Sequence, residues 1–208
     1  MASAHMSRVL TASGYAAAII VSVTYVDRPV AEFTSLHLLG SPLFAIAAGI
    51  LRSLRFVPLL AVVLLVCCGV WVAAHRRLAA WLRLPLLCSA AALPALLTAV
   101  SLKFMIGRSQ VVPLYLSSHL YVLHPFHGGA DYMAFPSATM AVAASIVTVL
   151  WTQRGPLRVP GALLLLVLAS CLIVTSGHWA ADIIGGIWLG FHVGRWTLSA
   201  RRLAAGTH

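Results

Sequence analysis

The chain has 208 residues, of which 61% are hydrophobic and only 9% are charged. This composition excludes an ordinary soluble domain and predicts an all-α, polytopic membrane protein. The formal net charge is +10. Because most of the arginines lie at the ends of apolar runs, this charge indicates contact with anionic membrane lipids and not with nucleic acid.

Six apolar segments are long enough for a spanning helix, which needs about 17 to 25 residues. We expect a helical bundle with spans at 9–26, 56–74, 84–102, 135–152, 159–176 and 181–198. Nothing marks a domain boundary, so residues 1–208 are expected to form one integral membrane domain. Met6 is a second candidate start, which would make residues 1–5 an addition to the natural chain.

The segment 31–51 follows the first span and is apolar over only part of its length. It holds Glu32, His37, Gly40 and Pro42, so it is predicted to be an interfacial or re-entrant helix. A seventh span is the alternative, and it would upset the orientation that the arginines give.

The arginines orient the six-span bundle, because cytoplasmic loops carry an excess of basic residues. Five cations fall on one side, namely Arg28, Arg52, Arg55, Lys103 and Arg108. Nine fall on the other, namely Arg8, Arg76, Arg77, Arg83, Arg154, Arg158, Arg195, Arg201 and Arg202. We therefore expect a bacterial-type inner membrane protein with both termini in the cytoplasm. The 103–134 loop and the turn at residue 178 would face the exterior.

Two cations end the third predicted span. Lys103 is the only lysine of the chain, and Arg108 follows it by about a turn and a half. Together they could hold a doubly charged anion from two directions, with Gly107 freeing the backbone between them. The alternative is a pair of interfacial anchors whose charged ends reach the lipid headgroups.

A second polar element opens the fourth predicted span. Pro136 is expected in the first helical turn, with the hydroxyls of Ser137 and Thr139 close to unpaired backbone N–H groups. Such a helix start favours an anion. The same residues are also typical of an ordinary helix start.

The third element is His178 with Asp182, where one apolar segment ends and the next begins. Residues four apart lie about one helical turn from each other, so the imidazole and the carboxylate can touch. Ionisable groups at a membrane edge are costly and often functional. The pair predicts a nucleophilic imidazole that the carboxylate orients, and the alternative is an interfacial histidine held by a structural carboxylate.

The order of these three elements resembles the type 2 phosphatidic acid phosphatase superfamily of integral membrane lipid phosphatases. The family motifs run K-x6-R-P, P-S-G-H and S-R-x5-H-x3-D, and the resemblance covers about half of the chain, from Lys103 to about Gly190. It implies a six-span fold with an outward-facing site. It also implies that His178 is the nucleophile that becomes phosphorylated and that Asp182 orients it.

The same resemblance implies a phosphate-binding set around the nucleophile. This set consists of Lys103, Arg108 from a shifted position, Ser137, and the backbone near Ala138 and Thr139. The implied chemistry needs no metal and no other cofactor, and the implied partner is a lipid phosphate substrate in the membrane.

The chain departs from the family pattern at all three motifs. The departing residues are Gln110 and Val111 in the first motif, Ala138 and Thr139 in the second, and Cys171 and Leu172 in the third. Thr139 stands where the family has the histidine that protonates the leaving group. Because loss of a general acid costs about 10²- to 10⁴-fold in rate, we expect a substrate whose leaving group needs no proton, such as a polyprenyl pyrophosphate.

Histidines crowd the loop after the third predicted span. They are His119, His124 and His127, with Asp131 shortly after. His124 or His127 could supply the missing acid. A metal site and purely local hydrogen bonds are the other readings, and the sparse ligand spacing argues against the metal.

The resulting hypothesis is a membrane lipid phosphatase that acts through a phosphohistidine at the outer membrane face. Two alternatives remain open. One is a non-catalytic descendant of the family that binds a lipid headgroup or a protein partner. The other is a lipid phosphotransferase.

Overall fold

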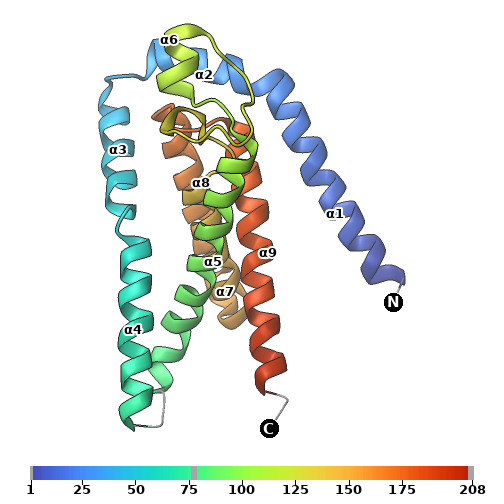
Figure 1. The fold of residues 1–208 in the computed structure, drawn as a ribbon, viewed down its shortest axis with the longest axis vertical. Helices are drawn as coiled ribbons and strands as arrows, with labels where there is room; N and C mark the ends of the chain where they lie inside the picture. Colours follow the sequence, from blue (N-terminus) through green and yellow to red (C-terminus); the bar gives the residue numbers. More distant parts are fainter. Residues whose placement is uncertain (1, 76–78, 206–208) are drawn as a thin grey trace.

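The computed structural model describes residues 2–75 and 79–205, and within them it is a bundle of helices with one isolated β-bridge. The all-α prediction is therefore confirmed for these residues (Figure 1). The helices are α1 (Ala2–Val21), α2 (Asp27–His37), α3 (Pro42–Leu54), α4 (Val57–His75), α5 (Arg83–Ile106), α6 (Leu116–Ser118), α7 (Ala138–Gln153), α8 (Arg158–Val174) and α9 (Ala180–Ala205).

Long apolar helical stretches indicate a membrane-embedded protein. Four of those in the described residues are long and apolar enough to cross a membrane, namely Leu10–His37, Pro42–His75, Ala80–Ile106 and Gly155–Val174. Helix α7 is apolar but, at 16 residues, shorter than a usual span. The count of six spans stays a prediction.

The segment 31–51 forms parts of two helices. Helix α2 continues α1 through a π-helical turn at Ser22–Val26 and lies across one end of the bundle, which we call the α2 end (Figure 1). A turn with Gly40 at φ 78° separates α2 from α3, and the Ser41 hydroxyl accepts the Phe44 N–H at 3.2 Å to cap α3. Helix α3 then leads into α4 almost end to end (Figure 1).

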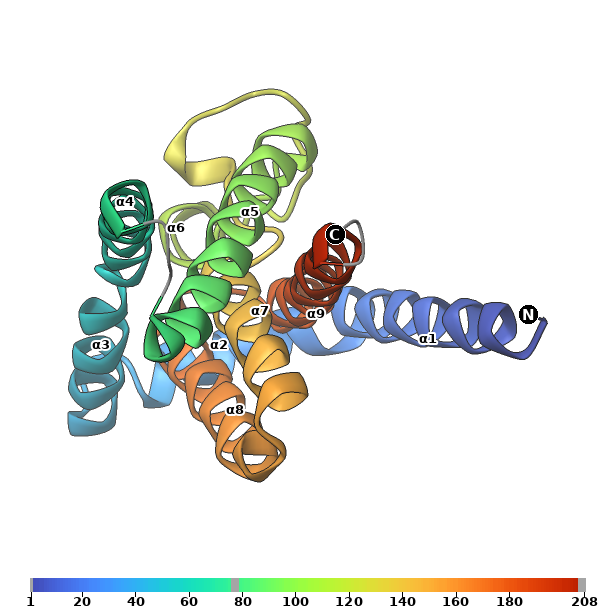
Figure 2. The ribbon, with the colours of Figure 1, turned by 90° about the horizontal axis from the view of Figure 1, so that it is seen from below.

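The remaining long helices pack side by side. Helices α5, α7, α8 and α9 form the centre, α3 and α4 stand on one flank, and α1 leans away on another (Figures 1 and 2). Helix α1 begins and α9 ends away from the α2 end (Figure 1). Of the predicted cytoplasmic cations, Arg76 and Arg77 lie outside the described residues, as do the side chains of Arg8, Arg201 and Arg202.

A stripe of glycines brings α9 close to α7, the most extensively packed helix pair among the described elements. The stripe consists of Gly186, Gly190 and Gly194, spaced four residues apart. A β-carbon at Gly190 would lie 2.2 Å from the Ala141 carbonyl oxygen and 2.8 Å from the Ala144 β-carbon. Small residues at this spacing are typical of close helix contacts in membranes.

We expect Gly190→Val to push α7 and α9 apart. The new β-carbon would clash with the Ala141 carbonyl oxygen, which is a backbone atom, so no change of side-chain rotamer can relieve the clash. The expected loss is about 1–3 kcal/mol of unfolding free energy, measured by titrating the purified protein with sodium dodecyl sulfate. Gly69→Val in α4 is the matched control, since nothing lies within 4 Å of a β-carbon there. Equal losses in both variants would contradict the close packing.

The segment that joins α5 to α7 folds over the α2 end. Gly107 ends α5 in the left-handed conformation at φ 60°, and its N–H donates to the Lys103 carbonyl at 2.9 Å. Only glycine fits, because a β-carbon would lie 1.7 Å from the His124 carbonyl oxygen. An apolar cluster beneath this segment joins it to α2 and to the start of α9, and its buried members are Ala31, Val111, Tyr115, Ala134 and Trp179.

Candidate functional site

His178 and Asp182 meet at the α2 end of the bundle. The Nδ1 atom of His178 lies 3.2 Å from the Asp182 Oδ2 atom, so the contact expected from their spacing is present. His178 lies in the turn before α9, whereas Asp182 lies in the first turn of that helix. The carboxylate also accepts the Trp179 backbone N–H at 3.1 Å, as an acidic residue at the third helical position does in a capping box.

The contact with Asp182 determines which nitrogen of His178 is free for chemistry. A carboxylate accepts a hydrogen bond, so Nδ1 carries the proton and the lone pair of the neutral ring is on Nε2. The His178 side chain is 15% exposed, whereas that of Asp182 is fully buried. This arrangement suits a nucleophile or a base that a fixed carboxylate orients.

Arg108 joins Asp182 to a second buried carboxylate, that of Asp27. Its Nη1 atom donates to the Asp182 Oδ1 atom at 2.6 Å, and its Nη2 atom donates to Asp27 and, at 2.5 Å, to the Tyr121 hydroxyl. The guanidinium also lies 5.4 Å from the Trp179 ring centroid. The fork of Arg108 thus holds two carboxylates at once through separate nitrogen atoms in a fixed planar geometry.

Asp27 was not predicted as a site residue, yet it is 1% exposed and fully hydrogen-bonded. Its Oδ1 atom accepts the Ser22 hydroxyl at 2.8 Å and the Ala181 backbone N–H at 3.0 Å. The Ala181 N–H is one of the unpaired donors at the start of α9, where a negative charge is favoured. Asp27 therefore serves as an anion that the protein itself places on this helix start.

Burial and the charges of the site shift the pKa values of Arg108 and Tyr121. Burial lowers the pKa of Arg108, but the charges of Asp182 and Asp27 outweigh burial and raise it above its ordinary value. Burial raises the pKa of Tyr121 to about 12. Arg108 is therefore a permanent cation, and Tyr121 is a neutral hydroxyl that donates to Asp27 at 3.0 Å.

Lys103 extends from the last turn of α5 to the backbone that precedes α7. Its ammonium donates to the carbonyl of Met133 and, at 2.9 Å, to that of Ala134. The Ala134 N–H in turn donates to the Arg108 carbonyl at 3.1 Å. The two predicted phosphate ligands, Lys103 and Arg108, are thereby brought together at the α2 end.

Ser137 caps α7 and ties it to Asp182. Its hydroxyl accepts the Met140 N–H at 3.4 Å, and its own N–H donates to the Asp182 carbonyl at 2.9 Å. Pro136 was expected within the first helical turn, but it precedes the cap, because Ser137 takes the capping position and α7 begins at Ala138. Ala138 and Thr139 line a cavity on the flank of the bundle where α3 meets α4.

The loop histidines form a cluster of their own. The rings of His124, His127 and Tyr132 contact one another, with centroids 4.8 to 5.3 Å apart. None of the contacts among the described side chains joins His124 or His127 to His178. The described residues also hold no group of three or more histidine, cysteine or acidic side chains arranged to bind a metal.

Little space is left beside His178. Helix α2 covers it, and the cavity there measures about 10 Å³, with Ala31 and Thr34 of α2 among its lining residues. The Thr34 hydroxyl lies 2.9 Å from that of Ser176. A cavity of this size holds about one water molecule, so a phosphate group fits there only if the surrounding residues, among them those of α2, move.

A larger cavity reaches Arg108 from the side of α1. It measures about 370 Å³ and lies between α1, the end of α5 and the loop that follows. Its polar lining consists of Arg108, Ser109 and Tyr121, and the rest is apolar.

Leu172 occupies the place where the resemblance implies an arginine. It is 4% exposed and packs in an apolar cluster with Met140, Leu168 and Ile183. Its surroundings suit packing and not an anion.

No protein-family model, curated protein or solved structure matches this chain.

Proposed function

We propose that the chain is a membrane lipid phosphatase with His178 as its nucleophile. The observation that carries this proposal is the bond from the His178 Nδ1 atom to a fully buried Asp182, which leaves the lone pair on Nε2. Arg108 and the Trp179 N–H hold the carboxylate in place, so the ring has one orientation.

In the proposed reaction the Nε2 atom of His178 attacks the terminal phosphorus of a lipid pyrophosphate. The bond from phosphorus to the bridging oxygen breaks, and the lipid monophosphate leaves with the electron pair. Asp182 stabilises the positive charge on the ring. Water then attacks the phosphohistidine, the phosphorus–nitrogen bond breaks, inorganic phosphate leaves, and one proton passes to solvent.

The cations near His178 support this reaction in different ways. Lys103 has three N–H donors and gives two to carbonyl groups, so one is left for a phosphate oxygen. Arg108 is bound by two carboxylates, so it acts mainly by positioning Asp182. Entry of a substrate requires the residues around His178, among them those of α2, to move, since the cavity there measures only about 10 Å³.

The proposal includes six passages through an inner membrane, with both termini in the cytoplasm and His178 facing the exterior. In favour of it, α1, α3 with α4, α5, α7, α8 and α9 run alternately towards and away from the α2 end (Figure 1). The basic residues Arg83, Arg154 and Arg158 begin or follow helices at the opposite end. By the positive-inside rule, that end is cytoplasmic.

The substrate preference follows from Thr139, which cannot donate a proton as histidine does. The detergent-purified protein should release phosphate from polyprenyl pyrophosphate faster than from phosphatidic acid or phosphatidylglycerol phosphate. We expect a difference on the order of 10²-fold, because a lipid phosphate leaves without a proton and a lipid alcohol does not. Release of phosphate from none of the three lipids would refute the phosphatase.

A second candidate function is binding of an anionic lipid without turnover. Two observations count against turnover at His178, namely the small space beside it and the Asp27 carboxylate on the start of α9. In that case the triad of Arg108, Asp27 and Asp182 would be purely structural. The substrate assay separates the two candidates, because only the phosphatase releases phosphate.

A further inference from the structure

An apolar cavity lies on the flank of the bundle where α3 meets α4. It measures about 320 Å³, within the usual size range of small-molecule sites, which is about 300 to 1,000 Å³. Aliphatic side chains from α3, α5, α7 and α8 line most of it, among them Leu51, Leu54, Leu96, Ile146 and Leu168. Such a lining fits a hydrocarbon chain.

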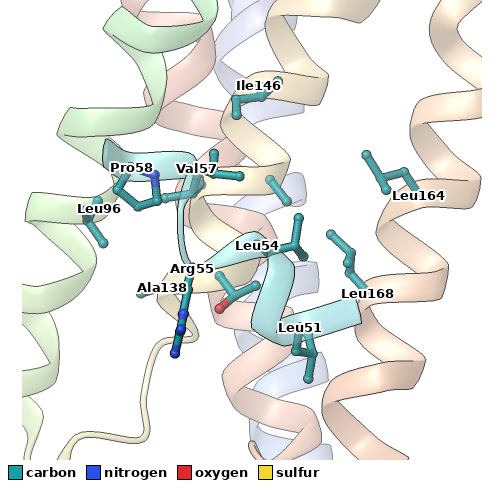
Figure 3. A pocket seen from close by; sticks show the side chains of 13 residues that line it. Leu51, Leu54, Arg55, Val57, Pro58, Leu96, Ala138, Ile146, Leu164 and Leu168 are labelled. Carbon is teal, nitrogen blue, oxygen red and sulfur yellow. The ribbon is translucent and has the colours of Figure 1, made fainter. Parts of the chain in front are cut away.

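Arg55 is the one cation in the lining of this cavity, and Thr139 is its other polar residue. Arg55 lies at the break between α3 and α4, and its side chain extends away from Leu54 and Leu168 to lie beside Ala138 (Figure 3). In the described part of the chain Arg55 makes no ion pair. Its guanidinium carbon lies 5.0 Å from the ring centroid of its neighbour Phe56, in a cation–π contact. An unpaired arginine above a hydrocarbon site is complementary to an anionic headgroup.

We propose that this cavity holds the hydrocarbon chain of a lipid phosphate and that Arg55 binds its phosphate. The proposal rests on the proposed function, because it names the substrate site of the same enzyme. Arg55 is the binding residue for the headgroup, and Ala143 is one of the residues whose small size leaves the cavity open.

The first residues of α7 lie between the cavity and the catalytic pair His178 and Asp182. Ala138 and Thr139 line the cavity, and the residue before them, Ser137, donates its N–H to the Asp182 carbonyl at 2.9 Å. Asp182 in turn binds His178. The cavity and the catalytic pair therefore both border the start of α7.

Lipid binding can be measured apart from turnover in the full chain carrying His178→Ala. Native mass spectrometry would follow the binding of phosphatidic acid, phosphatidylglycerol and the matching diacylglycerol. Arg55→Gln should weaken phosphatidic acid binding about tenfold and leave diacylglycerol binding unchanged, because only the charge is lost. Ala143→Phe should weaken both lipids, because the ring fills the space of the hydrocarbon chain.

Arg52→Gln is the matched control, since Arg52 is an exposed cation one turn earlier on α3 that does not line the cavity. Unchanged phosphatidic acid binding in Arg55→Gln would overturn the assignment, even if the wild-type protein hydrolyses lipid phosphates. An equal loss of phosphatidylglycerol binding would also overturn it, by identifying a site for a resident membrane lipid. Loss confined to phosphatidic acid supports the site, even if no lipid is hydrolysed.

Discussion

His178→Ala is expected to reduce phosphate release from polyprenyl pyrophosphate by at least about 10³-fold, because the variant has no atom to carry the phosphoryl group. The fold should survive, since the His178 side chain is partly exposed and its only side-chain hydrogen bond in the structure is to Asp182. Phosphate release by the purified variant, beside its thermal unfolding in detergent, measures both effects.

His192→Ala is the matched control for this experiment. His192 lies on α9, the helix that begins just after His178, and its side chain is exposed. Its Nδ1 atom lies 3.1 Å from the Trp188 carbonyl oxygen within the same helix. It should retain wild-type phosphate release. Equal activity of wild type and His178→Ala would rule out a phosphohistidine at this position.

The largest effect on stability is expected for Arg108→Met. Removal of the guanidinium leaves the buried carboxylates of Asp27 and Asp182 without their shared cation. Breaking a buried ion pair from one side costs about 3–5 kcal/mol, and titration with sodium dodecyl sulfate would measure the loss in unfolding free energy. The same variant tests whether Arg108 positions Asp182, because His178 then loses a fixed partner.

A double variant gives this prediction its control. In Arg108→Met with Asp27→Leu, one of the two uncompensated carboxylates is gone, so part of the lost stability should return. Asp182 keeps the Trp179 N–H and His178 as partners. If the double variant were less stable than Arg108→Met alone, the charge balance proposed for this triad would be wrong.

Apolar runs were sufficient to predict where most helices lie. The expected spans 56–74 and 159–176 correspond to Val57–His75 and Arg158–Val174. The first predicted span, 9–26, ends too early, because the helical stretch does not stop at residue 26 but continues to His37. In the sequence, Asp27 and Arg28 look like the polar end of the first span. Asp27 is buried instead because it pairs with the distant Arg108.

The site could be predicted where it depends on local spacing and not where it depends on long-range contacts. The His178 and Asp182 contact follows from a separation of four residues. The partnership of Arg108 with Asp27 spans 81 residues and carries no local signal. The glycine stripe of α9 did carry a local signal in the sequence, because small residues repeated every four positions indicate a helix contact surface. Its members are Gly186, Gly190 and Gly194.

The carboxylate of Asp27 also has a consequence for the order of assembly during synthesis. Its cationic partner Arg108 follows it by 81 residues, so about half of the chain is made before the Asp27 charge can be paired. The Ala181 N–H follows Asp27 by 154 residues. Until then a charge without partners is costly to bury and stays in water. We therefore expect α2 to reach its final place only after Arg108 has been made.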